Sequence, residues 1–250
     1  MARLNSLLAG LLLMMAGFSA AQQPPSEVAG KHGTSEPALG KEVEWLSYRD
    51  AYRSMLRFEK YGKAKSFLQN HFQISPKDKT VATDALRLDL ISKSSRLHLS
   101  LDATGRTALP LLKTAYDENA ELLLNQKVNQ FQFRPRVSIL IRTDGVYEST
   151  DLREACEQAL AYQHFLDAAL LRGKKCLGVR FVYPKKNQDA IVEIRHGARI
   201  FTVLPMLDGA AFWDETNERF KTATYLFSNI QDKTQLVTRS APIAIAALFD

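Results

Sequence analysis

The chain has 250 residues, of which 46% are hydrophobic and 24% are charged. This is ordinary for a globular protein, and the length suffices for one large or two small domains. The formal net charge of +6 at pH 7 favours anionic partners. The chain carries no recognised nucleic-acid-binding motif, so no nucleic acid is expected among its partners.

The first 21 residues predict a cleaved secretory signal peptide. Arg3 supplies a short positive region, an apolar run follows at 7–18, and small residues precede a cleavage site between Ala21 and Gln22. The run is shorter than the roughly 20 apolar residues of a spanning helix, and no later segment reaches that length. We therefore expect a periplasmic or secreted protein with no transmembrane span after signal cleavage. An uncleaved anchor helix is the alternative.

Residues 22–43 predict a disordered linker. This segment holds three prolines and three glycines but few apolar side chains, too few to offset the entropy lost on ordering. The folded part is expected to begin near Glu44, with a first α+β unit at 44–148 and a second at 149–250.

The first segment after the linker combines helical spacing with positive charge. Tyr48, Tyr52 and Met55 predict one apolar stripe of a helix. Within residues 49–65, six basic residues against two acidic ones leave a net charge of +4. This pattern favours binding of an anionic envelope polymer, a lipid surface or an acidic protein, whereas a solvated helix face is the alternative. The expected binding residues are Arg49, Arg53, Arg57 and Lys60.

Alternating apolar and polar residues next predict antiparallel strands. Leucines alternate at 86–90 and 97–101, and the turn at 102–105 ends on Gly105, which can adopt positive φ. Pro135 is expected to mark an edge or a break. Further strands are predicted at 107–111, 122–125, 130–134 and 137–142.

A long helix is predicted to follow from Ser149, with a stop at Gly173 and then a strand from Cys176. Its stripe includes leucines and alanines spaced three and four residues apart. Asp151 and Glu154 resemble an acidic variant of the capping box at the start of the helix.

Cys156 and Cys176 are the only cysteines in the sequence. An exported chain meets an oxidising compartment, so the two predict a disulfide. The rise of a helix and the reach of the returning chain allow this closure only if the helix ends or bends before about Leu170. A buried free thiol at Cys156 is the alternative.

Two signatures recur at nearly constant spacing. Leu-Pro at 109–110 recurs at 204–205, and an aromatic-Asp-Glu element at Tyr116 recurs at Trp213. This spacing favours an internal duplication, with chance similarity as the alternative. The predicted fold class is therefore α+β, with two tandem units that each run from a helix into an antiparallel β-meander.

The repeated element also supplies a candidate acidic site. Paired carboxylates can act as general acid and base or hold a hard cation, whereas acidic residues at the start of a short helix can instead offset its dipole. No stronger catalytic signature is present, so no catalytic residue is assigned and neither a cofactor nor a metal site is predicted. The candidate residues are Asp117, Glu118, Asp214 and Glu215.

We therefore expect an exported cell-envelope protein that acts as a non-enzymatic binding or structural module for an anionic component. Two alternatives stay open. One is a carboxylate- or cation-dependent hydrolase acting on an envelope polymer at an acidic pair. The other is a periplasmic assembly factor or chaperone, which would expose an apolar groove.

Overall fold

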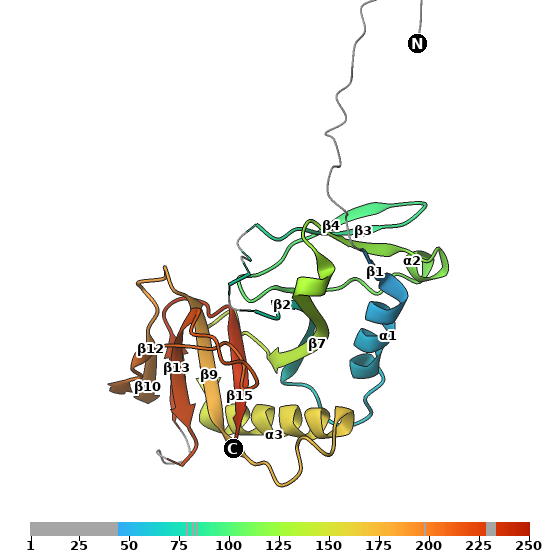
Figure 1. Cartoon of the computed structure of the whole chain (residues 1–250). Helices are drawn as coiled ribbons and strands as arrows, with labels where there is room; N and C mark the ends of the chain where they lie inside the picture. The colour runs from blue at the N-terminus through green and yellow to red at the C-terminus, as the bar shows by residue number, and fades with distance from the viewer. Residues whose placement is uncertain (1–44, 79, 82, 84, 198, 229–233) are drawn as a thin grey trace, which may run out of the picture. The chain divides into compact units, whose positions relative to one another are not determined.

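The computed structural model describes residues 45–250, apart from residues 79, 82, 84, 198 and 229–233. Within this part the chain is α+β with antiparallel sheets, as predicted (Figure 1). The predicted signal peptide at 1–21 and linker at 22–43 lie outside the described residues. No helix of the described part is both long and apolar enough to cross a membrane.

A seven-stranded sheet combines strands from both halves of the chain. Figure 1 shows β2 and β7 of the first half in the same sheet as β9 and β15 of the second. The two predicted units therefore share this sheet across the proposed boundary between residues 148 and 149. In spatial order its strands are β12 (Met206–Gly209), β13 (Phe220–Leu226), β9 (Cys176–Pro184), β15 (Ala244–Phe249), β7 (Phe131–Ile139), β2 (Leu68–Pro76) and β5 (Arg106–Thr107).

Two four-stranded sheets have matching strand orders. In each sheet, one edge strand comes just before a helix and pairs with a second strand. The second strand pairs with a third, which forms a β-hairpin with the fourth. The predicted duplication stays a prediction. One sheet contains β1 (Trp45–Ser47), β6 (Glu121–Leu124), β3 (Leu88–Ile91) and β4 (Arg96–Leu99). The other contains β8 (Val146–Glu148), β14 (Gln235–Thr238), β10 (Val192–His196) and β11 (Arg199–Val203).

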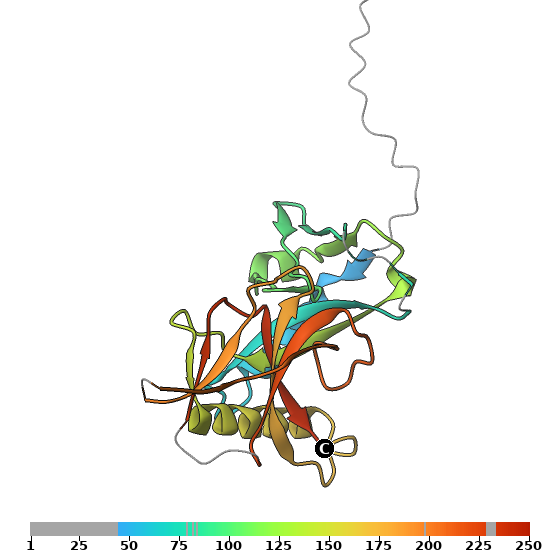
Figure 2. The same ribbon diagram turned by 90° about the vertical axis from the view of Figure 1, so that its left-hand side faces the viewer.

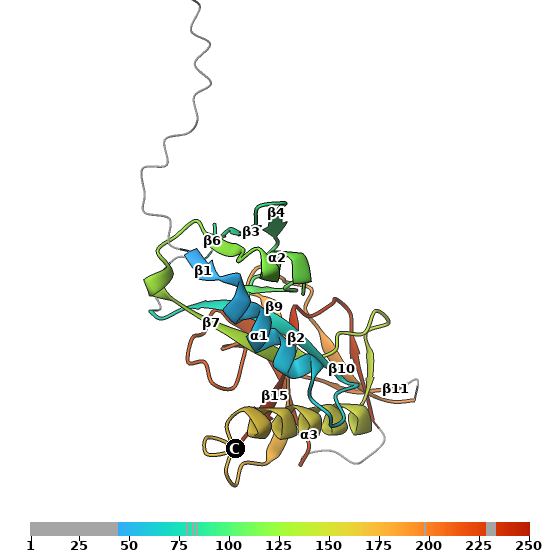
Figure 3. The same cartoon turned by 90° about the vertical axis from the view of Figure 1, so that its right-hand side faces the viewer.

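The two longer helices pack against the seven-stranded sheet. Figure 3 shows α1 (Tyr48–Glu59) beside β2 and β7, and Figure 2 shows α3 (Ser149–Leu166) along strands of both halves. Phe58 of α1 meets Tyr162 of α3 edge to face, with 5.2 Å between ring centroids, so the end of α1 joins the apolar core that contains α3. The other buried residues of α1 lie in a second core, with β3 and β6. The remaining helices are α2 (Lys113–Asp117) and the 3₁₀ turn η1 (Val128–Gln130).

The predicted capping box of α3 is wrong. The helix begins at Ser149, and its N-cap residue Glu148 makes no side-chain cap bond. The Ser149 amide donates to the Thr234 carbonyl at 2.9 Å, and the Ser149 hydroxyl accepts from the Thr234 amide at 3.2 Å. These bonds fix the start of the helix through its contact with the chain before β14, which leaves Asp151 inside the first turn.

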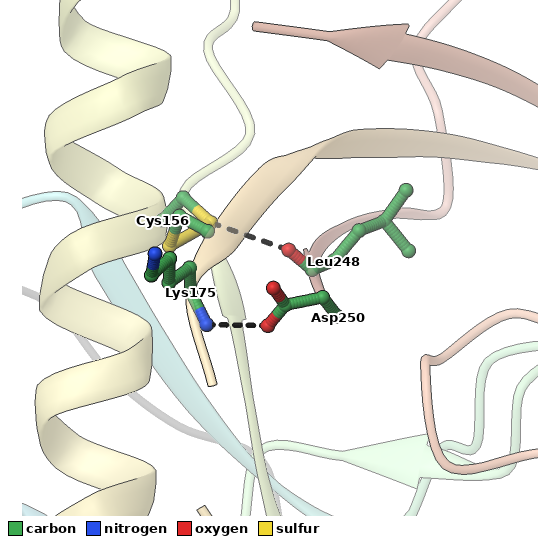
Figure 4. Close-up of a disulfide and its surroundings, with 5 residues drawn as sticks. Cys156, Lys175, Leu248 and Asp250 are labelled. Atoms are coloured by element: carbon green, nitrogen blue, oxygen red, sulfur yellow. Dashed lines mark hydrogen bonds between the residues drawn. A yellow bond between two sulfur atoms is a disulfide. The ribbon is translucent and has the colours of Figure 1, made fainter. Parts of the chain in front are cut away.

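The predicted disulfide is present. It joins Cys156 on α3 to Cys176 at the start of β9, with 6.0 Å between the Cα atoms (Figure 4). The helix ends at Leu166, which meets the geometric condition for closure, so the stop predicted at Gly173 is wrong. Cys156 is fully buried, and its sulfur lies 3.8 Å from the Leu248 carbonyl oxygen of β15. Because a bridged sulfur carries no proton, this is a packing contact, and the bridge ties α3 and β9 together beside β15.

Two strand predictions change in the structure. The strand expected at 107–111 is reduced to β5, because the backbone beyond it turns toward α1: the Tyr48 hydroxyl donates to the Pro110 carbonyl at 2.5 Å and accepts from the Leu112 amide at 2.8 Å. Pro135 does not break its strand, since β7 runs through it and pairs with β2 along its whole length.

The predicted turn at 102–105 is confirmed, and a substitution at Gly105 can test its close contact with β2. The φ of Gly105 is +76°, and an added Cβ would lie 2.1 Å from the Ile74 carbonyl oxygen of β2. Gly173 has nearly the same φ, +75°, but nothing lies within 4 Å of its Cβ position. We expect Gly105→Ala to cost about 1–3 kcal/mol more than Gly173→Ala, because only the first adds a clash to the shared left-handed strain. Urea unfolding of both variants measures the difference, and equal losses would contradict the contact.

Candidate functional site

The face of the seven-stranded sheet opposite the helices carries buried polar groups. Along β7, Val137 and Ile139 pack into the core that contains α3. The alternate residues Arg134, Arg136 and Ser138 point the other way, since successive side chains of a strand face opposite sides. Arg136 is only 4% exposed, so it needs partners within the protein.

The loop at 210–219, which connects β12 to β13, covers this polar face. Phe212 is buried, and its ring centroid lies 4.4 Å from the Arg136 guanidinium carbon and 5.4 Å from that of Arg106. A ring face attracts such cations. Phe212 thus places the following residues of the loop, Asp214 and Glu215, over the arginines.

Asp214 and Glu215 form ion pairs with β7. Asp214 accepts from Arg134 Nη1 and from Arg136 Nη1, each at 2.7 Å. Glu215 Oε1 lies 3.5 Å from Arg136 Nη2 and 3.8 Å from Arg134 Nη2. The structure therefore brings this predicted acidic pair together with two cations, and we call these four residues the arginine–carboxylate cluster.

Neighbouring strands complete the hydrogen bonding of the cluster. The buried Gln73 of β2 accepts from Arg136 Nε at 2.7 Å and donates to Glu215 Oε1 at 3.2 Å and to the Thr104 carbonyl at 3.1 Å. Gln73 thereby links the cluster to the turn at 102–105.

Arg106 on β5 extends this buried polar layer. Its Nε and Nη2 atoms donate to Asp102 at 3.0 and 2.8 Å, and its Nη1 donates to the Ser138 hydroxyl at 2.9 Å. The side chain of Arg106 is 2% exposed. Asp102, in the turn just before β5, therefore balances the positive charge of Arg106.

The electrostatics of the cluster hold Asp214 in its charged form. Burial alone would raise the pKa of this carboxyl, but the charge and hydrogen bond of Arg136, with the charge of Arg134, outweigh burial and lower the pKa below its ordinary value. Burial and the neighbouring Arg136 lower the pKa of Arg134. An ionised carboxylate bound by arginines is a poor proton donor near neutral pH.

Two cavities adjoin the cluster. The larger, of about 380 Å³, lies between the end of β2, the turn at 102–105 and the loop ahead of β13. The smaller, of about 260 Å³, is lined by Arg134 and Asp214. The two share walls at Ser75, Glu215 and Asn217. The cluster therefore forms the inner border of a polar recess.

The other predicted acidic pair lies elsewhere and is not part of this recess. Helix α2 ends at Asp117, and Glu118 is its C-cap, so the interpretation that these residues offset the start of a helix is wrong. Asp117 pairs with the exposed Lys113 at 2.5 Å. Glu118 accepts from the amide and hydroxyl of Ser94, at 3.1 and 3.0 Å. Asp117 thus pairs within α2, whereas Glu118 holds the turn between β3 and β4.

The predicted basic residues divide into two groups along α1. Arg49 donates to the Tyr116 carbonyl at 2.7 Å, and Arg53 donates to the Tyr116 hydroxyl at 3.2 Å. These two residues hold the carboxyl end of α2. Arg57 and Lys60 are exposed and form no ion pair within the described part of the chain.

Sequence reasoning missed the cationic side of the cluster. Arg134 and Arg136 were not singled out, although polar residues occupy every second position from Gln130 to Ser138. In a strand this alternation predicts a polar face. A polar face on a long strand, together with an acidic pair left without a helix to cap, is the signal that could have found the cluster.

The chain matches no protein-family model, and neither a similar curated protein nor a similar solved structure was found. Among the described residues, no group of three or more His, Cys, Asp and Glu side chains converges as metal ligands would.

Proposed function

We propose that the chain is an exported, non-enzymatic binding module for an anionic component of the cell envelope. The signal peptide and the descent of the two halves from a duplication are part of this proposal. The disulfide is compatible with export, since such bonds persist in oxidising compartments.

One observation carries the proposal. The exposed cations Arg57 and Lys60 at the end of α1 have no carboxylate partner in the described structure. Unpaired surface cations retain their field and attract an anionic surface or polymer. Arg49 and Arg53 belong to the same helix face, but they also serve to hold α2.

The hydrolase alternative has less support. Its best acidic pair, Asp214 and Glu215, is occupied by Arg134 and Arg136. Activity would require one carboxylate to exchange protons, which the lowered pKa of Asp214 opposes.

An assembly factor is the second candidate, and a specific feature favours it. Among the described strands, β11 is an edge strand, and Ile200, Phe201 and Val203 on it are 48%, 64% and 50% exposed. Edge strands with apolar side chains can pair with another chain. This candidate would be favoured if the protein binds an unfolded polypeptide and still binds it after Arg57 and Lys60 have been replaced.

We expect Arg57→Gln/Lys60→Gln to weaken binding to vesicles of phosphatidylglycerol and phosphatidylcholine by at least about tenfold, since each cation near such a surface contributes about 1 kcal/mol. Salt should weaken binding of the variant less than that of the natural protein. Cosedimentation measures both. The matched control is Lys93→Gln/Lys127→Gln, which removes the same charge at two other exposed positions, and an equal loss in both variants would show that only net charge matters.

A further inference from the structure

The charges around the two cavities are unequally satisfied. Three of the four lining carboxylates, Asp102, Asp214 and Glu215, already face Arg106 or Arg136, which do not line either cavity. The fourth, Asp78, accepts from the amide and hydroxyl of Thr80 and forms no ion pair with a described residue. The lining cations that form no ion pair with a described residue are Lys77, Lys186 and Arg219. Three such cations against the one carboxylate of Asp78 leave the charge of the recess positive.

The recess is also built for polar groups. Ser75 and Asn217 line both cavities. The Oδ1 atom of Asn217 is buried without a hydrogen-bond partner in the described part, and leaving such an atom unpaired is costly. Turning this amide toward a ligand would break no existing bond of Oδ1. Hydroxyl groups suit both Ser75 and Asn217, because a hydroxyl donates and accepts.

The size and position of the recess favour a small molecule. A volume of about 380 Å³ falls within the roughly 300–1,000 Å³ of small-ligand sites. Its inner wall includes Gln73, whose side chain is hydrogen-bonded to Arg136 and Glu215. A wall fixed in this way is ready before the ligand arrives.

We infer that this recess binds a small hydroxylated organic anion, whose carboxylate or phosphate group lies near Arg219 and Lys186. Guanidinium and ammonium groups suit both kinds of oxyanion. The site is separate from the α1 cations and does not depend on the function proposed for them.

Isothermal titration calorimetry with glucose 6-phosphate, glucuronate and glucose tests this inference on the full chain. The natural protein should bind at least one of the two anions with a Kd of about 1 mM or tighter, and glucose at least about tenfold more weakly. The preferred anion tells phosphate from carboxylate. Failure to bind either anion, or equal binding of glucose, would overturn the inference.

Variants locate the site. Lys186→Gln/Arg219→Gln should weaken anion binding at least about tenfold, whereas Lys93→Gln/Lys127→Gln, with the same net charge and at exposed positions away from the recess lining, should leave it unchanged. Arg219 also donates to the Thr83 hydroxyl, so thermal unfolding checks the fold. If the double variant fails to fold, Lys186→Gln alone, at an exposed position, should still weaken binding. Unchanged binding in a folded variant would place the anion elsewhere.

Discussion

Replacing Arg136 by methionine is expected to lower the free energy of unfolding by about 3–5 kcal/mol, the usual cost of removing one partner of a buried ion pair. The loss follows from the groups left behind. Asp214 loses one of its two cationic partners, and Glu215 loses the nearer of its two cationic partners. The side-chain oxygen Oε1 of Gln73 loses its hydrogen-bond donor. Urea unfolding measures the change.

Arg142→Met is the matched control, because Arg142 pairs with Asp144 while both side chains are 51% exposed. Exposed pairs contribute about 0–1 kcal/mol, so this variant should be nearly as stable as the natural protein. Adding Glu215→Gln to Arg136→Met should recover part of the loss, since Glu215 would otherwise keep only Arg134 at 3.8 Å, while the 2.7 Å pair of Arg134 with Asp214 is left intact. If Arg136→Met lost no more than Arg142→Met, the cluster would not stabilise the fold.

Removing the disulfide by Cys156→Ala/Cys176→Ala is expected to cost about 3 kcal/mol, because the bridge closes a loop of about 20 residues in the unfolded chain. Cys156 is fully buried, so the loss of its sulfur from the core adds to this cost. Chemical denaturation under non-reducing conditions measures the change.

A reductant provides the control for this prediction. It should lower the stability of the natural protein toward that of the double alanine variant and leave the variant unchanged. A natural protein that is indifferent to reductant while its disulfide is shown to be reduced would contradict the stabilising role of the bridge.

Local patterns predicted the parts of the fold that depend on neighbouring residues. The α3 stripe, the turn at Gly105 and the disulfide follow from helical spacing, from the conformational freedom of glycine and from the reach of a short loop. The start of α3 did not follow, because Thr234, far along the chain, fixes Ser149 by hydrogen bonds.

The candidate site was half predicted. Asp214 and Glu215 were identified as a pair, but their partners Arg134 and Arg136 lie about 80 residues earlier. Only the order of strands in the shared sheet brings these segments together, and spacing along the sequence does not specify that order. The same aromatic-Asp-Glu sequence at Asp117 and Glu118 does not form an arginine–carboxylate cluster, because there the chain forms the end of α2.

The position of β15 has a consequence for how the molecule is made. This strand lies between β9 and β7 and is the last described element along the chain. Until residues 244–249 have been synthesised, the early strands β2 and β7 have no strand to join them to β9. An emerging chain thus carries two incomplete sheet fragments with open edges, and the central sheet can close only after β15 has been made.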